Sequence, residues 1–394
     1  MKLLLCLFAL AATAMSESGL DLLKSGNEQF TAKMFQEVVS EKKGQSVVIS
    51  AFSVLSPLAQ LALASEGASH DDILKAIGLP NDEVTKQVFT EISKDLRSVT
   101  GVELKLANRI YVKQDAQLNE AFSAVSKDVF NSDAKNVDFS QADAAAGEIN
   151  AWVEDNTNHR ITNLVDPKSL DATTQAVLVN AIYFKGNWKK PFEVHDTRDR
   201  DFYLTKDNII KVPTMYKSEN LKYVESKELD AKLLELPYKG GESSLLIVLP
   251  NEIDGITSLV NKLKDPSTLN KAVDEMSYTD VHLYLPKFKI ETTTDLGEVL
   301  KKMGLQKLFT PGQAQLSKLL KGSPDVFISG AIQKAYIDVN EVGAEAAAAN
   351  AFISLGLMPL APPLPPRQFK VDRPFYFELK QNNTNLFNGV LTQP

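Results

Sequence analysis

The stretch VLVNAIYFKGNW at residues 177–188 decides the fold of this chain. Its first eight residues are apolar and mostly β-branched or aromatic, apart from Asn180 at their middle. A continuous apolar run of this length is typical of a strand that is covered on both faces. Asn180 then predicts a polar contact inside the core, because a buried side-chain amide needs hydrogen-bond partners.

Further strands are predicted on the C-terminal side of this run. LLIVL at residues 245–249 and HLYL at residues 282–285 are two more apolar runs, each followed by a proline. Phe375, Phe377 and Leu379 alternate along the chain, which indicates a half-buried strand.

The first 160 residues, in contrast, are expected to be mainly helical. Phe30, Met34 and Val38 recur at helical spacing. SHDD at residues 69–72 resembles a capping box, and Gly78 should end the helix that it starts. Helices followed by strands, with no linker, repeat or long charge block, predict a single α+β domain.

Composition restricts the classes of function. The 394 residues are 44% hydrophobic and carry a net charge of −7, so neither nucleic acid nor an anionic membrane is expected as partner. H-E-x-x-H, G-x-S-x-G, G-x-G-x-x-G and phosphate-loop sequences are absent, and the four histidines are scattered. We therefore expect no enzyme, no cofactor and no metal site.

The first fifteen residues have the pattern of a secretory signal peptide. A basic start at Met1-Lys2 leads into the apolar residues 3–12, and ATA at residues 12–14 supplies small residues for cleavage. The expected organisation is a signal peptide over residues 1–15 and one domain over residues 16–394, secreted to the extracellular space.

Two consequences follow from secretion. The only cysteine, Cys6, lies in the leader, so the mature protein has no disulfide and its core must supply the stability. Asn382-Asn383-Thr384 is the only N-x-S/T sequon, and it predicts a glycan on Asn382.

Residues 341–368 have the composition of a loop. EVGAEAAAANA at residues 341–351 is small and free of proline, whereas five prolines crowd into residues 359–366. The prolines lack backbone donors and should form an exposed, polyproline-like arm. The alanines could enter a sheet without overpacking, or form an exposed helical turn, and the prolines could equally be a linker or an SH3-type ligand.

Taken together, these motifs resemble the serpin family, and the secreted insect serpins in particular. The resemblance runs from about residue 20 to residue 394. It rests on NAIYFKGNW at 180–188, VPTM at 212–215, LPKF at 285–288, DRPF at 372–375 and LFNG at 386–389, in that order. It implies an α+β serpin fold with three β-sheets, about nine helices and an exposed reactive-centre loop at about residues 341–368.

The resemblance also implies a mechanism. A serine protease attacks the loop and is held as a covalent acyl-enzyme, while the cleaved loop inserts into the main sheet as a strand. About 15 residues span roughly 50 Å, enough to cross a domain. The inhibitor, expected to be a monomer, supplies no catalytic residue of its own.

The start of the loop matches the hinge of inhibitory serpins. The hinge residues are Glu341, Gly343, Ala344, Glu345, Ala346, Ala347 and Ala348. Strand alternation would turn Ala344, Ala346, Ala348 and Asn350 into the sheet, where their small size should meet little steric cost.

The cleaved residue usually falls sixteen positions after the hinge glutamate, which gives Leu357, followed by Met358. A leucine there indicates targets of the chymotrypsin, elastase or subtilisin type, which have apolar specificity pockets. The loop is longer than is usual in the family, so Leu360 and Arg367 remain alternative reactive residues.

Two polar groups can be assigned from the resemblance. The shutter, where the main sheet opens, comprises Ser53, Ser56, Asn180 and Gln333. The breach, at the top of the sheet, comprises Trp188, Lys287 and Glu341, and we expect an ion pair there that restrains premature insertion. Charges of both signs alternate around Lys86, Lys94 and Arg97, so heparin is not expected as a cofactor.

Three other functions remain open. A non-inhibitory serpin, acting as carrier, chaperone or storage protein, would share the fold, and only the small hinge residues speak against it. An enzyme lacks any supporting motif. A proline-rich adaptor would need a cytosolic partner that a secreted protein does not meet.

Overall fold

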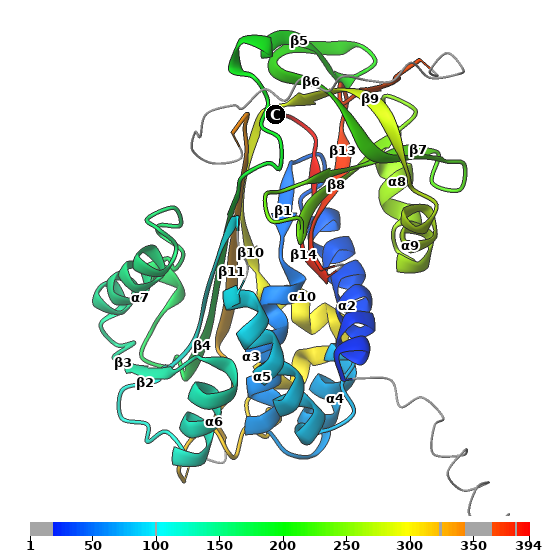
Figure 1. Ribbon diagram of the computed structural model, residues 1–394. Helices are drawn as coiled ribbons and strands as arrows, with labels where there is room; N and C mark the ends of the chain where they lie inside the picture. Colours follow the sequence, from blue (N-terminus) through cyan, green and yellow to red (C-terminus); the bar gives the residue numbers. More distant parts are fainter. Residues whose placement is uncertain (1–18, 99–100, 323–324, 343–364, 383) are drawn as a thin grey trace, which may run out of the picture.

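The structure is a computed structural model, shown in Figure 1, and describes residues 19–98, 101–322, 325–342, 365–382 and 384–394. The predicted signal peptide at residues 1–15, the hinge from Gly343 to Ala348 and the candidate reactive residues Leu357, Met358 and Leu360 lie outside these residues.

Nine α-helices occur in the described part of the chain. They are α2 (Gly19–Glu41), α3 (Ala51–Ala64), α4 (Gly67–Ile77), α5 (Asp82–Ser98), α6 (Glu120–Phe130), α7 (Ala142–Asn156), α8 (Ile256–Lys262), α9 (Pro266–Asp274) and α10 (Leu296–Leu300). Shorter helical turns are η1 (Pro167–Ser169), η2 (Val194–Asp196), η3 (Lys301–Leu305) and η4 (Gln306–Phe309).

A five-stranded sheet forms one wall of the molecule. Its strands, in spatial order, are β10 (Phe288–Asp295), β11 (Gly330–Val339), β4 (Ala176–Gly186), β2 (Val102–Lys113) and β3 (Ala134–Val137). β11 and β4 run parallel, and so do β2 and β3, while the other neighbours are antiparallel. The predicted central strand at residues 177–184 is therefore confirmed as β4.

A nine-stranded sheet forms the rest of the β-structure. Its path is β1 (Val47–Ile49), β14 (Thr384–Leu391), β13 (Phe375–Gln381), β8 (Ser243–Pro250), β7 (Ala231–Pro237), β6 (Asn208–Ser226), β9 (Ser277–Pro286) and β12 (Arg367–Lys370), with β5 (Arg198–Thr205) paired to β6. β6 pairs with β5 and β9 along its first part and with β7 near its end. The family resemblance predicts three sheets, whereas the described residues form two. The strands of two expected sheets make one sheet here because both groups pair with the long strand β6.

Both faces of β4 are covered, which explains its continuous apolar sequence. Leu178, Ile182 and Phe184 pack into the main core, which fills the space between the two sheets and includes α2 and α3. Val179 and Tyr183 point the other way, into a smaller cluster beneath α7. In Figure 1, α3 and α7 lie on opposite sides of this sheet.

Two local predictions need correction. α4 begins at Gly67, two residues before the proposed capping box, and Ser69 lies inside it, where its hydroxyl donates to the Gln313 carbonyl at 3.0 Å. The predicted end is confirmed, because Gly78 has a left-handed φ of 74°. The N-terminal region also contains β1, β2 and β3, so it is less helical than expected.

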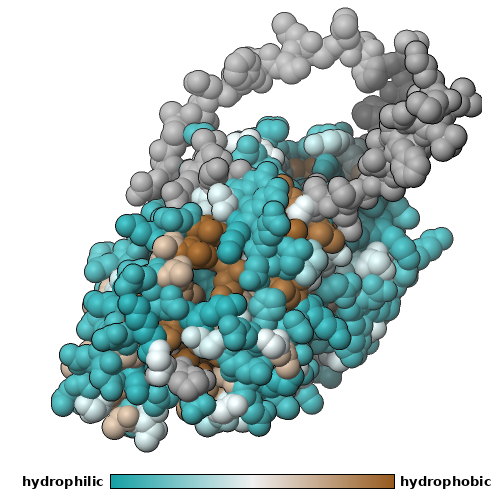
Figure 2. Space-filling model, turned by 90° about the horizontal axis from the view of Figure 1, so that it is seen from below, coloured by the Kyte–Doolittle hydropathy of each residue, from teal (hydrophilic) through white to brown (hydrophobic). Residues whose placement is uncertain are grey.

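Figure 2 shows the molecule from below. Most of this face is hydrophilic, and apolar residues come to the surface near its middle. None of the described helices has the length and apolar character needed to cross a bilayer.

Candidate functional site

The contact between β4 and β11, which we call the β4–β11 seam, is one of the two parallel strand contacts in the five-stranded sheet. Eight residue pairs face each other across it, from Val177 opposite Gly330 to Phe184 opposite Ile337. The pairing is parallel, and parallel ladders are slightly less stable per residue than antiparallel ones. Both outer neighbours, β2 and β10, pair antiparallel to the seam strands.

A buried cluster of polar side chains crosses the seam at the predicted shutter. Asn180 and Gln333 face each other in the register, and Gln333 Nε2 donates to Asn180 Oδ1 at 2.6 Å. Ser53, at the start of α3, donates from its hydroxyl to the same oxygen at 2.8 Å. Asn180 Nδ2 in turn donates to the Ser53 carbonyl at 2.9 Å. The structure thus brings three of the four predicted shutter residues into one network.

The cluster is larger than the sequence indicated. Ser50 caps α3 and exchanges two hydrogen bonds with the Gln333 side chain, at 2.8 and 3.3 Å. Asn108, opposite Asn180 on β2, accepts from its amide. Ser56, the fourth predicted residue, is half-buried, and no described residue hydrogen-bonds its side chain.

This network joins the two strands of the seam by buried side-chain hydrogen bonds. Asn180 and Gln333 are fully buried and Ser53 is 1% exposed, so none of them can exchange these bonds for water. Each such bond contributes about 0.5–1.5 kcal/mol net, and an orphaned partner costs about 1–3 kcal/mol. A strand entering between β4 and β11 would have to break the bond from Gln333 to Asn180.

The predicted breach pair is present at the top of the seam. Lys287 Nζ lies 2.9 Å from Glu341 Oε2, and the Thr197 hydroxyl donates to the other carboxylate oxygen at 2.9 Å. The Glu341 side chain is 8% exposed and that of Lys287 is 40% exposed. Thr197 was not foreseen, because nothing in its local sequence distinguishes it.

The electrostatics of Glu341 favour its charged form. Burial raises the pKa of its carboxyl group, but hydrogen bonds from Lys287, its own backbone and Thr197 outweigh burial. The net result is a pKa below the ordinary value for glutamate. The ion pair with Lys287 is therefore complete at neutral pH.

Trp188 holds the chain where it leaves β11. Its indole Nε1 donates to the Asn340 carbonyl at 2.7 Å, and its ring stacks on Tyr238 at a centroid distance of 4.3 Å. The backbone N–H of Phe192 donates to the Glu341 carbonyl at 2.9 Å. The three predicted breach residues therefore lie together and restrain the same turn.

A second group of polar contacts lies on the face of the sheet that α7 covers. Lys334 of β11 is 7% exposed, and its Nζ lies 2.7 Å from Glu291 Oε1 of β10. The same Nζ donates to the Thr162 carbonyl at 2.8 Å, in the segment between α7 and β4. Nearby, the rings of Tyr183 and Tyr336 touch across the seam, with centroids 5.6 Å apart.

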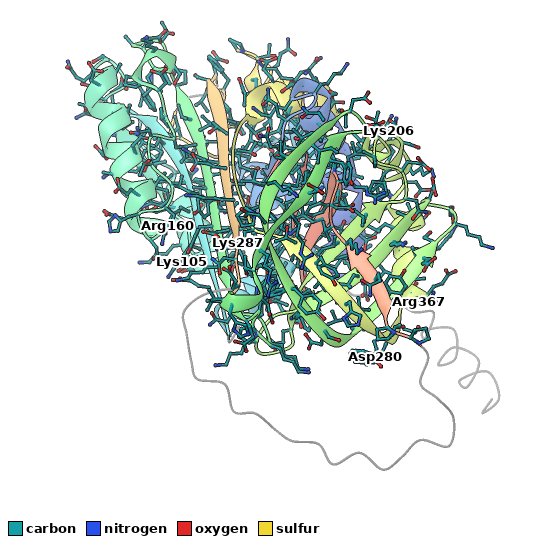
Figure 3. The ribbon with its side chains drawn as sticks, turned by 90° about the horizontal axis from the view of Figure 1, so that it is seen from above. Lys105, Arg160, Lys206, Asp280, Lys287 and Arg367 are labelled. Carbon is teal, nitrogen blue, oxygen red and sulfur yellow. The ribbon has the colours of Figure 1, made fainter. Side chains whose placement is uncertain are left out.

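The two ends of the loop are fixed far apart. Figure 3 shows Lys287 near the middle of the upper face and Arg367 toward one side of it. Lys287 pairs with Glu341, next to the point where the described chain stops at Val342, and Arg367 lies near Pro365, where it resumes. Arg367 is the first residue of β12, which pairs with β9. This alternative reactive residue therefore lies in a sheet.

The sequon residue Asn382 is at the surface. It is exposed, has a φ of 45° and lies in the turn between β13 and β14. Its backbone N–H donates to the Glu242 carbonyl at 2.8 Å.

Comparison with known proteins agrees with this architecture. The family model described as Serpin (serine protease inhibitor) matches residues 25–394. Alaserpin of Manduca sexta is 55% identical over the whole of both chains, and Antichymotrypsin-2 of Bombyx mori is 55% identical over 94% of this chain and 98% of its own. The crystal structure of Serpin48, a highly specific serpin of the insect Tenebrio molitor, matches with a TM-score of 0.86 and 38% identity, covering 94% of this chain and 98% of that one.

The chain belongs to the serpin family. Its fold is the α+β serpin fold, and the family is one of serine protease inhibitors rather than enzymes.

Proposed function

We propose that this serpin is a secreted suicide substrate, which traps its target by inserting the cleaved loop into the β4–β11 seam. The single observation that carries this proposal is the topology of the seam. β11 runs parallel to β4 and leaves the sheet at Glu341, beside Trp188, at the top of the gap between them. A chain that turned back there would run antiparallel to both strands.

Insertion would improve the hydrogen bonding of the sheet. One parallel ladder of eight pairs would be replaced by two antiparallel ladders, one on each side of the new strand. Residues 344–357, which would enter, carry no proline, and Ala344, Ala346, Ala348 and Asn350, which would face into the sheet, have small side chains. The intact protein is then a kinetically trapped state. The hydrogen bonds and ion pairs at the shutter, at the breach and around Lys334 hold the seam closed.

We assign the reactive bond to Leu357-Met358. The leucine fits a protease with an apolar specificity pocket, and the name of the related Antichymotrypsin-2 is consistent with this class of target. Secretion rests on the leader at residues 1–15, and the exposed position of Asn382 supports its use as a glycan site. The covalent complex is that of one inhibitor monomer with one protease.

A matched pair of hinge variants tests the mechanism. Ala346→Arg would place a long charged side chain inside the sheet, whereas Ala347→Arg would place it outside, because alternate residues of a strand face opposite sides. With chymotrypsin we expect A346R to be cleaved as an ordinary substrate and A347R to retain an SDS-stable complex. If wild type is itself cleaved without a complex, the protein is a non-inhibitory serpin and the proposal fails.

The bond assignment has its own test. Mass spectrometry after incubation with chymotrypsin, elastase and trypsin should give a C-terminal fragment that begins at Met358. A fragment that begins at Ala361 would move the reactive residue to Leu360, and one that begins at Gln368 would move it to Arg367.

A further inference from the structure

A groove lies beside the point where the chain resumes after the loop. Its volume is about 820 Å³, and β6, β9 and the start of β12 form its walls. The residues used below are Glu225, Glu275, Tyr278, Asp280, Pro365 and Arg367, all of which line it. We propose that this β6–β9 groove is a second docking surface for the protease that attacks the loop. The inference rests on the proposed function and identifies the surface chemistry of the partner.

The first argument is position. β12 pairs in parallel with β9, with Arg367 opposite Val281, so the end of the loop is anchored at the groove. Leu357 precedes Arg367 by ten residues, and ten extended residues span at most about 36 Å. A protease engaged at Leu357 therefore stays within reach of this corner of the molecule, where Figure 3 shows Asp280 and Arg367.

The second argument is charge. Glu225, Glu275 and Asp280 contribute three carboxylates to the lining, against the single guanidinium of Arg367. Arg367 does not neutralise them, because its Nη1 lies 3.9 Å from Glu225 Oε1 and both side chains are more than half exposed. The groove is thus an acidic surface, and its complement is a basic one.

The third argument is the aromatic side chain at the rim. Tyr278 is 70% exposed and is one of four large hydrophobic residues exposed in the described chain. A tyrosine held on a strand has few rotamers to lose, and tyrosines are enriched among residues that dominate binding energy. Lys222 lies opposite Tyr278 in the ladder, but its ammonium group pairs with Glu235 at 3.0 Å. The ring and the carboxylates of the lining together fit a protein surface with an apolar patch and lysines or arginines around it.

Such a surface would change the rate at which the protease associates with the inhibitor, and not the loop insertion that traps it. Complementary charges at an interface rim raise the association rate and fix orientation, while the loop carries out the insertion. The groove would therefore select among proteases that share an apolar specificity pocket, favouring those with a basic surface near the active-site cleft.

A pair of charge reversals tests the groove, with chymotrypsin, a basic protease, as the probe. The variant Glu275→Lys/Asp280→Lys should associate about 3- to 10-fold more slowly than wild type at low salt. The ratio of the two rates should approach one in 1 M salt, where the Debye length is about 3 Å. Tyr278→Ala should slow association at both salt concentrations.

The matched control is Asp115→Lys/Glu120→Lys. These carboxylates are 80% and 87% exposed and lie in the turn before α6 and at its start, at the opposite end of the molecule in Figure 1. The net-charge change is the same, and we expect its association rate to stay within twofold of wild type. Inhibition stoichiometry should be unchanged in all three variants. Because Glu120 pairs with Lys321 at 2.6 Å, thermal unfolding serves to check that the control variant is folded at the assay temperature.

The outcomes separate this inference from the proposed function. If wild type forms an SDS-stable complex and E275K/D280K associates no more slowly than D115K/E120K, the groove is not a docking surface and trapping stands. If wild type forms no complex, both are overturned.

Discussion

The β4–β11 seam and the β13–β14 pair are both buried, but their strands run in different relative directions and their side chains meet differently. The seam is parallel and crossed by amides and hydroxyls. The β13–β14 pair is antiparallel over seven residue pairs, and Phe377 lies opposite Gly389, where its ring occupies the space that a side chain on that glycine would need. Under the proposed mechanism, the seam separates when the loop inserts, whereas the β13–β14 pair stays closed.

This contact with Phe377 explains why the LFNG motif has a glycine at position 389. A Cβ at Gly389 would lie 2.5 Å from the Phe377 ring and 2.4 Å from the Val47 carbonyl oxygen. The same ring packs against Phe288 and Phe375, at centroid distances of 5.5 and 6.2 Å. Here apolar packing of side chains adds to the antiparallel backbone ladder that holds the neighbouring strands together.

The largest effect should come from the closed region. Phe377→Ala removes a fully buried ring and should lower the free energy of unfolding by about 3–5 kcal/mol. Urea denaturation of intact and loop-cleaved protein measures it. The loss should be equal in both forms, because insertion does not change the nine-stranded sheet. A loss confined to one form would show that the two regions are not independent.

Asn180→Ala should have the next largest effect, and an unequal one. It removes the buried oxygen that accepts from Ser53 and Gln333 and the amide that donates to Asn108, while Ser53 and Gln333 keep their bonds to the Ser50 carbonyl. The loss should be about 1–3 kcal/mol in the intact protein. After cleavage the inserted strand separates Gln333 from Asn180, so the loss should be smaller. The same urea experiment on both forms checks this.

Asn150→Ala is the matched control for the seam. The Asn150 side chain makes two hydrogen bonds, both to the Val165 backbone at 2.8 and 2.9 Å, against four for Asn180, and it lies on α7. We expect its cost to be the same in intact and cleaved protein. Equal losses for Asn180→Ala as well would remove the shutter from the account.

Lys287→Ala should cost at most about 1 kcal/mol at pH 7, because Lys287 is partly exposed. The pKa of Glu341 is lowered in the folded protein, so the stabilisation is present above the ordinary glutamate pKa and is lost as pH falls through the folded value. The stability difference between variant and wild type should therefore shrink between pH 7 and pH 3.

Lys301→Ala tests whether position matters for that ion pair. Lys301 pairs with Glu298 at 2.8 Å, and its side chain is 41% exposed, close to the 40% of Lys287. Only Lys287→Ala should also speed spontaneous polymer formation on warming, since only Lys287 holds the chain at the top of the seam. Equal polymerisation rates would contradict a restraining role for the breach.

The smallest effect on stability is expected at Asn382. Asn382→Gln should remove the mass of a glycan from protein secreted by insect cells and leave the inhibition rate unchanged, because the residue is exposed and far from the loop in the sheet order. An unchanged mass would show that the sequon is not used.

The sequence indicated more of the strands than of the contacts between them. Residues 177–184 were recognised as a central strand because their apolar run is local, and Asn180 was recognised because it interrupts the run. Asn108 and Ser50 were missed, because only the register of β2 against β4 and the position of the α3 cap bring them to Asn180. Alternation in VELKLANRIYV at residues 102–112 was the available signal for β2.

The breach shows the same limit. Lys287, Glu341 and Trp188 were assigned from family resemblance, and the structure places them at one turn. Thr197 comes from the segment after η2, so its bond to Glu341 depends on tertiary structure alone. Strands can be predicted from local sequence patterns, whereas hydrogen bonds and ion pairs between segments far apart in the sequence are seen only in the folded structure.

The most direct test of the central claim is the heat stability of the protein before and after its loop is cut. Thermal unfolding should be followed by circular dichroism on intact protein and on protein cleaved in the loop at residues 343–364. We predict that the cleaved form unfolds at a far higher temperature, because the seam gains two antiparallel ladders. An unchanged unfolding temperature would contradict insertion at the β4–β11 seam.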